Sequence, residues 1–333
     1  MIKMHQRHFF YILLPLIVAC GSLTQRKSFY VDQEKRIFIV DLPKTPSDKD
    51  IKNTTDCPRP VLYVLHGNPS NATLMRKYTG LDETTSYSEF IIVHLSAQKN
   101  RWAYKYDTAK IQNEITYLDR VIDLVDSSYN TDTSKRFLVG FSGGGFFISQ
   151  FLSQSENQVH GVALVGSTLM RESRCLSNYN NVIPWLLIIG TEDPFYNGTL
   201  FSQPADSSVM YLVKANNCST TPQIHKFVDT NKSDSSSVRD NYFSSKNGND
   251  VWYVEITNGG HHWPNAVFNP NFLFPKSKLG NLNRDFDTNK YLIAFFEHCL
   301  STSDFNIELN LDTNSKWNVL GKQPEVQNNE KWK

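Results

Sequence analysis

Short, almost continuous apolar runs recur along the chain between residues 36 and 256. Such runs are typical of strands in a parallel sheet that is buried on both faces, whereas half-exposed strands alternate apolar and polar residues. We therefore expect strands at residues 36–40, 61–65, 90–95, 136–139, 159–165, 185–189 and 251–256.

Helical patterns lie between these runs. Residues 111–129 place apolar side chains at three- and four-residue spacing, and residues 146–152 and 290–300 are also expected to be helical. Strands that alternate with helices predict the α/β class, with a mostly parallel central sheet and helices on both faces. We expect a single domain, in which the polar residues 233–250 form a surface hairpin or loop.

Composition narrows the class of protein. The 333 residues include 34 Lys and Arg against 33 Asp and Glu, which is a formal charge of +1. Nucleic-acid-binding proteins normally carry a basic excess, so this balance argues against a nucleic-acid partner. A hydrophobic content of 40% is typical of a globular protein with a large core.

The N-terminus has the features of an export signal. Lys3 and Arg7 precede an apolar run at residues 9–19. That run is shorter than the roughly 20 residues that a membrane-spanning helix needs, but it suits a signal peptide. The run ends in Leu-Ile-Val-Ala-Cys-Gly and resembles the bacterial lipoprotein box, in which Cys20 would be lipidated after cleavage in front of it. The alternative is an ordinary signal peptide that is cleaved nearby.

Four cysteines follow this segment: Cys57, Cys175, Cys218 and Cys299. In an exported protein they would allow two disulfides in any of three connectivities. A Cys175–Cys218 pair is one candidate, because both residues fall in expected loops. No cysteine stands in a spacing typical of zinc ligands, so no metal site is expected.

The strongest motif is Gly140-Phe141-Ser142-Gly143-Gly144, which stands between an expected strand and an expected helix. This is the context of a G-x-S-x-G nucleophile elbow, where small neighbours allow a strained turn to expose the serine hydroxyl. The alternative is a phosphate-binding turn, which is disfavoured because no Lys-Ser/Thr follows the glycines.

A serine nucleophile needs a base and an orienting acid, which follow it along the chain in folds of this kind. The acid candidates are Asp193 and Glu192, in the turn after residues 185–189. The base candidates are His261 and His262, in the Gly-rich loop after residues 251–256. Local sequence alone leaves both choices open.

An oxyanion hole needs two backbone N–H donors, one after the nucleophile and one from an earlier strand–helix loop. His66-Gly67-Asn68 directly follows the expected strand at residues 61–65. We therefore expect the donors to be the N–H groups of Asn68 and Gly143. His66 is expected to shape the loop.

Together these motifs resemble the polyhydroxybutyrate depolymerase and feruloyl/acetylxylan esterase group of α/β-hydrolases. The resemblance covers roughly residues 36–300 and rests on VLYVLHG, GFSGGG, GTEDP and GGHHWP. The family pattern implies that Asp193 is the acid and that His261, two residues before Trp-Pro, is the base. Asn68 and residues 194–198 depart from the pattern, which puts the choice of substrate in doubt.

The resemblance implies a serine carboxylic-ester hydrolase that works through an acyl-enzyme on polysaccharide-linked or hydroxyalkanoate esters, with no cofactor or metal. The alternatives are a serine peptidase on the same fold and a non-catalytic binding protein on a hydrolase scaffold. The partner is then an ester substrate, small or oligomeric. Four aromatic residues are candidates for an apolar substrate wall: Trp102, Phe141, Tyr196 and Trp263. For each of them, packing in the core is the competing interpretation.

The expected organisation combines these features. Residues 1–19 are a signal peptide, residues 20–35 a linker, residues 36–300 the α/β-hydrolase catalytic domain and residues 301–333 a polar tail. We expect the protein outside the cytoplasm, either secreted or anchored at the cell envelope, with membrane contact only through a lipid on Cys20.

Overall fold

One sheet of ten strands, in the order β1-β2-β4-β3-β5-β6-β7-β10-β9-β8, crosses the molecule. The computed structural model describes residues 24–31, 33–43, 57–84, 89–171, 182–268 and 279–301. The strands are β1 (Thr24–Val31), β2 (Glu34–Asp41), β3 (Arg59–Leu65), β4 (Ile91–Leu95), β5 (Thr131–Phe141), β6 (Gly161–Val165), β7 (Trp185–Gly190), β8 (Gln223–Lys226), β9 (Ser237–Phe243) and β10 (Val251–Thr257).

The centre of the sheet is parallel and its two ends are antiparallel. Strands β4, β3, β5, β6, β7 and β10 pair in parallel. β1 and β2 extend one end in antiparallel pairing, and β9 and β8 extend the other. Every residue of β4, β6 and β7 is buried, which explains why their sequences are continuous apolar runs.

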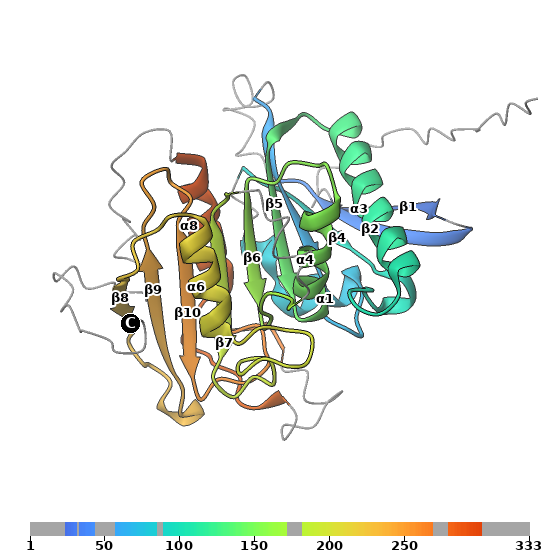
Figure 1. Cartoon of the computed structure of the whole chain (residues 1–333). Helices are drawn as coiled ribbons and strands as arrows, with labels where there is room; N and C mark the ends of the chain where they lie inside the picture. Colours follow the sequence, from blue (N-terminus) through green and yellow to red (C-terminus); the bar gives the residue numbers. More distant parts are fainter. Residues whose placement is uncertain are drawn as a thin grey trace, which may run out of the picture.

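Helices cover both faces of the sheet (Figure 1), as the sequence predicts. They are α1 (Ala72–Thr79), α2 (Leu81–Thr84), α3 (Thr108–Ser128), α4 (Gly143–Gln154), α6 (Ala205–Ala215) and α8 (Thr288–Ser301), with short 3₁₀ turns η2 (Gln98–Asn100) and η3 (Lys232–Asp234). α3, α4 and α6 pack into one apolar cluster, and α1, α2 and α8 pack into another across the sheet.

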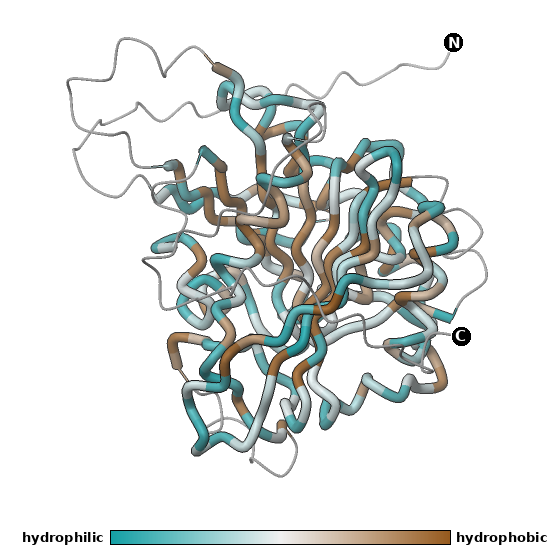
Figure 2. The backbone as a smooth tube through the Cα atoms, turned by 90° about the vertical axis from the view of Figure 1, so that its left-hand side faces the viewer, coloured by the Kyte–Doolittle hydropathy of each residue, from teal (hydrophilic) through white to brown (hydrophobic). Residues whose placement is uncertain are grey.

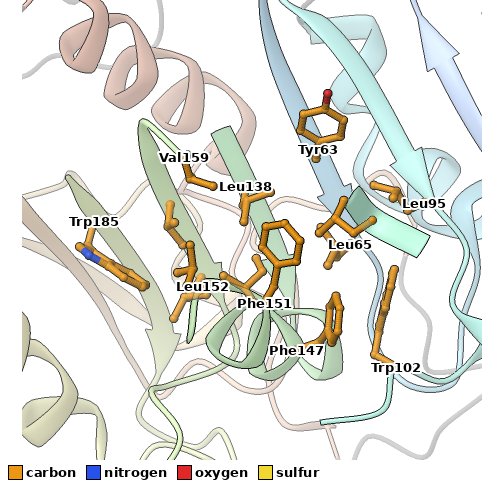
Figure 3. Close-up of a cluster of buried hydrophobic side chains, with 14 of the residues drawn as sticks. Tyr63, Leu65, Leu95, Trp102, Leu138, Phe147, Phe151, Leu152, Val159 and Trp185 are labelled. Carbon is orange, nitrogen blue, oxygen red and sulfur yellow. The ribbon is translucent and has the colours of Figure 1, made fainter. Parts of the chain in front are cut away.

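The alternation of side chains along β3 divides the core between these clusters. Tyr63 and Leu65 point to the α3–α4–α6 side, whereas Leu62 and Val64 point to the α1–α2–α8 side. In Figure 3, Phe147 of α4 lies beside Trp102, with which it stacks at 4.9 Å between ring centroids. Figure 2 shows the most hydrophobic segments running through the middle of the molecule, where the parallel strands lie.

Two parts of the fold differ from the sequence-based expectation. Residues 24–31, expected within a linker, form β1 and pair with β2 along their whole length. β9 lies within the polar segment 233–250 and forms a hairpin with β10, one of the two expected alternatives, but it is the second-last strand of the central sheet, between β10 and β8, rather than a surface feature. Its buried polar residues find partners there: the Asn241 amide, for example, donates to the backbone carbonyl of Tyr253.

The expected disulfides are not present in the described part of the chain. Cys57, Cys218 and Cys299 are free thiols, and Cys175 lies outside the described residues. The predicted signal peptide with Cys20 and the polar tail from residue 302 onward also lie outside them. Among the described residues, no helix combines the length and the apolar character that a membrane span requires.

Candidate active site

Ser142 stands in the turn between β5 and α4. Its backbone has φ 52° and ψ −117°, a left-handed conformation that a residue with a side chain adopts only under strain. The turn is held from both sides, because the Ser142 N–H donates to the carbonyl of Val165 on β6 and its own carbonyl accepts from Phe146 in α4. The sequence motif and the observed backbone thus agree on a nucleophile elbow.

His261 connects Ser142 to Asp193. Its Nε2 lies 2.9 Å from Ser142 Oγ, and its Nδ1 lies 2.6 Å from Asp193 Oδ2. The Asp193 side chain is fully buried, whereas that of His261 retains 13% exposure. In this arrangement the Nδ1–H donates a hydrogen bond to Asp193, and Nε2 is left to accept a proton from the serine hydroxyl.

The loops that carry the acid and the histidine touch each other. They follow the neighbouring parallel strands β7 and β10, whose carboxyl ends meet at one edge of the sheet. A Cβ on Gly190, at the end of β7, would lie only 2.0 Å from the carbonyl oxygen of Gly259, so this approach requires glycine. Glu192 is exposed, and among the described residues no hydrogen bond joins it to His261 or His262. Asp193 is buried and accepts from His261 Nδ1.

His262 has a different environment from its neighbour. It is buried, and its Nε2 lies 3.3 Å from the carbonyl oxygen of Gly280. Burial lowers the pKa of His262 to about 4, so the ring is neutral at pH 7. The structure therefore brings together Ser142, Asp193 and His261, and it leaves His262 in a packing position.

Asn68 is the residue of the β3–α1 loop that faces the elbow. Its side-chain amide donates to the Trp102 carbonyl at 3.0 Å, and its Oδ1 accepts from the Trp102 N–H at 2.9 Å. A Cβ on Gly143 would lie 2.5 Å from the Asn68 side chain, so the two expected oxyanion donors are neighbours. Neither backbone N–H donates a hydrogen bond within the part of the chain that the structure describes.

His66 supports this loop, as the sequence predicts. Its Nδ1–H donates to the Gly67 carbonyl at 2.7 Å, and its Nε2 accepts from the Ala97 N–H at 3.0 Å. Burial lowers the pKa of His66 to about 4. The ring is therefore neutral, in the tautomer that both hydrogen bonds require.

The predicted substrate-wall residues divide into two groups. Phe141 stacks on the His261 ring at 5.3 Å between centroids, and Tyr196 lies in the turn of Asp193, to whose carbonyl its N–H donates at 2.9 Å, with its hydroxyl bonded to Glu255. Trp102 and Trp263 are instead buried in the core. The Trp263 indole N–H donates to Asn289, and Trp102 stacks on Phe147, so the structure gives these two residues packing contacts rather than a place on a wall.

Phe195 is an aromatic neighbour of the site that sequence reasoning did not single out. Its ring and that of His261 form a T-shaped pair at 5.4 Å between centroids, whereas Phe141 is stacked on the same imidazole. Phe195 also packs against Phe146 and Phe201, which together with Tyr104 form an aromatic cluster. Phe146 follows Ser142 by one helical turn, and this spacing is the signal that could have found the cluster.

The order of the strands, with helices on both faces of the sheet, is that of the α/β-hydrolase fold. The solved structure of acetyl xylan esterase from Aspergillus awamori superposes with a TM-score of 0.53 and 11% identity, over 78% of this chain and 98% of that one. S-formylglutathione hydrolase from Staphylococcus aureus aligns over 53% of this chain and 82% of its own, with 15% identity and a TM-score of 0.41.

One curated relative also aligns with the sequence. The putative esterase NocK of Nocardia uniformis subsp. tsuyamanensis is 22% identical in an alignment of 232 residues, which covers 63% of this chain and 67% of that protein. No protein-family model matches the chain. The superposition on the acetyl xylan esterase confirms the α/β-hydrolase fold, and the names of that enzyme and of NocK agree with the resemblance to esterases that the motifs predict.

Proposed function

We propose that this protein is an exported serine carboxylic-ester hydrolase with Ser142 as nucleophile, His261 as base and Asp193 as orienting acid. The hydrogen-bonded chain from Ser142 Oγ through His261 to Asp193 carries the proposal, because it supplies the nucleophile, base and acid in the geometry of acyl transfer. The esterase descriptions of NocK and of the Aspergillus awamori enzyme support the ester as the substrate class.

The reaction follows from these positions. Ser142 Oγ attacks the ester carbonyl carbon while its proton passes to His261 Nε2, and Asp193 stabilises the resulting imidazolium. The proton then goes to the departing alcohol as the carbon–oxygen bond breaks, which leaves an acyl-serine. Water, deprotonated by the same histidine, hydrolyses this acyl-enzyme and restores the serine.

The backbone N–H groups of Asn68 and Gly143 are proposed to receive the oxyanion. Gly143 follows the nucleophile, and the Asn68 side chain is held by two hydrogen bonds to the backbone of Trp102, which keeps its loop next to the elbow. Rigid donors of this kind stabilise the tetrahedral intermediate at no reorganisation cost, and each is typically worth about 3–4 kcal/mol.

Phe141 and Phe195 lie around the histidine and are proposed to contact the substrate, together with the aromatic cluster behind Phe195. Apolar walls suit largely uncharged esters. We propose polysaccharide-linked or hydroxyalkanoate esters as the finer class, on the motif resemblance and the acetyl xylan esterase likeness.

Export is proposed from the N-terminal segment, with either secretion or a lipid on Cys20 as the final state. Mass spectrometry of the protein from a secreting bacterial host, compared with Cys20→Ser, tests this. A lipid-modified N-terminal Cys20 that Cys20→Ser lacks would support the anchor, cleavage of both forms without lipid would support secretion, and an unprocessed Met1 would contradict export.

The proposed activity is tested with 4-nitrophenyl acetate, a peptide panel and a fluorophosphonate probe on wild type and Ser142→Ala. We expect ester turnover and probe labelling in the wild type, and a loss of at least about 1,000-fold in kcat with no labelling in Ser142→Ala. Peptide cleavage without ester turnover would favour a serine peptidase. A folded protein that neither reacts nor labels would favour the binding-protein interpretation.

A further inference from the structure

A buried carboxylate lies beneath the turn that carries Asp193. Glu255, on β10, is 6% exposed, and the Tyr196 hydroxyl donates to its Oε2 at 2.6 Å. Arg239 stands directly opposite on β9 and contacts Oε1 at 2.6 Å. A buried carboxylate without partners would be strongly destabilising, so the hydrogen bond from Tyr196 and the ion pair with Arg239 are needed to hold Glu255 in this position.

Tyr196 also belongs to the turn that forms the acid site. The Phe195 N–H donates to Asp193 Oδ1 at 2.8 Å, and the Tyr196 N–H donates to the Asp193 carbonyl at 2.9 Å. Residues 193–196 therefore form one compact unit. That unit presents a carboxylate to His261 Nδ1 at 2.6 Å, and the Phe195 ring lies in a T-shaped arrangement with the His261 ring, at 5.4 Å between centroids.

Part of the turn that carries Asp193 is exposed to solvent. Pro194 and Asn197 are exposed on either side of the two aromatic residues. Glu255, in contrast, belongs to the interior of the sheet, where it pairs in register with Ile189 of β7. The Tyr196–Glu255 hydrogen bond thus joins a turn that has exposed residues at two positions to the interior of the sheet.

We propose that Tyr196 is a positioning residue: its hydrogen bond to Glu255, itself held by Arg239, locks the acid turn and keeps Asp193 and Phe195 on His261. The proposal rests on the proposed function of the Ser142–His261–Asp193 site. Small displacements of a positioned group can cost about 100-fold in rate, so a single hydroxyl remote from the substrate carbonyl can influence kcat.

The chain offers a matched control. The Tyr253 hydroxyl donates to the same Glu255 oxygen at 3.2 Å, but Tyr253 lies on β10 and is not part of the acid turn. Tyr196→Phe and Tyr253→Phe each remove one hydroxyl from one carboxylate, at a comparable cost of about 1 kcal/mol in stability. A merely structural role predicts similar behaviour of the two variants.

The experiment compares both variants with wild type by 4-nitrophenyl acetate kinetics, thermal melting and the downfield proton NMR signal of the His261–Asp193 hydrogen bond. We expect Tyr196→Phe to lower kcat about 10- to 100-fold with KM nearly unchanged, and to shift or broaden the downfield signal. Tyr253→Phe should keep kcat within about twofold and keep the signal, although its Tm falls by a similar amount.

Equal kcat losses in both variants, or a Tyr196→Phe variant with wild-type kcat and an unchanged signal, would overturn the positioning role. The NMR signal does not depend on turnover, which separates the two proposals. If wild type hydrolyses no ester while Tyr196→Phe alone still perturbs the signal, the positioning role stands and the proposed function falls.

Discussion

Around His261, individual contacts determine which of two adjacent histidines can act. His261 has a hydrogen-bond partner on each ring nitrogen, Ser142 on one side and Asp193 on the other. His262 is buried with its Nε2 at the Gly280 carbonyl, and burial lowers its pKa to about 4, which makes it a weak base near neutral pH. Two adjacent histidines therefore differ in their surroundings: His261 contacts Ser142 and Asp193, whereas His262 is packed in the interior.

We expect His261→Ala to lower kcat for 4-nitrophenyl acetate by at least about 1,000-fold, because the base is lost. His262→Ala should retain far more activity but lower the Tm, because it leaves a cavity in the packed loop. Steady-state kinetics and thermal melting of both variants check this. The opposite order of activities would identify His262 as the base.

Asn68 is the second residue whose side chain is expected to influence the rate. In Asn68→Ala, both hydrogen bonds to the Trp102 backbone are lost and the oxyanion loop loosens, so we expect a 10- to 100-fold lower kcat. Asn71→Ala is the matched control, because it removes only the α1 cap, in which Asn71 Oδ1 accepts from the Leu74 N–H. The control should cost about 1 kcal/mol in stability and leave kcat unchanged; equal kcat values in both variants would contradict the role of Asn68.

Among the elements, β4 contains a buried polar group with no evident function. His94 is fully buried, and within the described residues neither ring nitrogen has a hydrogen-bond partner. The groups that face it are Asp41, 3.8 Å away, and Arg76, which binds Asp41. Burial lowers the pKa of His94 to about 4.

This environment predicts a pH-dependent difference between wild type and His94→Leu. In the unfolded chain His94 is protonated below its ordinary pKa of about 6.5, whereas in the folded protein it stays neutral down to about pH 4. Protonation therefore favours the unfolded chain between these values, and the wild type loses stability as the pH falls. His94→Leu should be neutral or slightly stabilising at pH 7, and its advantage should grow by about 2 kcal/mol at pH 5. Urea unfolding at both pH values measures this, and a pH-independent difference would refute it.

The elements of the site were predictable for a physical reason. Parallel strands that are buried on both faces must be apolar throughout, so β3, β5, β7 and β10 are visible in sequence, and the chemical motifs follow their carboxyl ends. The prediction failed where polar residues form a strand. In β9, Arg239 and Asn241 find partners on β10, and no local pattern reveals partners supplied by a distant segment.

At the scale of the whole molecule, the contribution of β1 to stability can be tested by removing this strand. It caps one end of the sheet, far along the strand order from β5, β7 and β10, and its Phe29 packs against Phe38 and Tyr117. Removal of β1 exposes the edge of β2 and removes the packing of Phe29, which should lower the free energy of unfolding by about 2 kcal/mol or more.

We therefore compare a chain that begins at residue 20 with one that begins at residue 33. The shorter chain should melt at least about 4 °C lower, because a large domain loses about 2 °C or more per kcal/mol. Its kcat for 4-nitrophenyl acetate should stay within about twofold at a temperature where both are folded. Equal melting temperatures would mean that residues 24–31 behave as the linker that was first expected.

The sequence by itself determined the α/β class, the strand–loop positions of the motifs and the candidates for nucleophile, acid, base and oxyanion donors. These depend on the period of apolar residues and on small residues at turns, which are local properties. The tertiary structure decided that Asp193 rather than Glu192 reaches His261, that Phe195 contacts its ring and that Glu255 lies beneath Tyr196. Each of these contacts joins residues from different strands or loops, and only the packing of neighbouring strands brings such residues together.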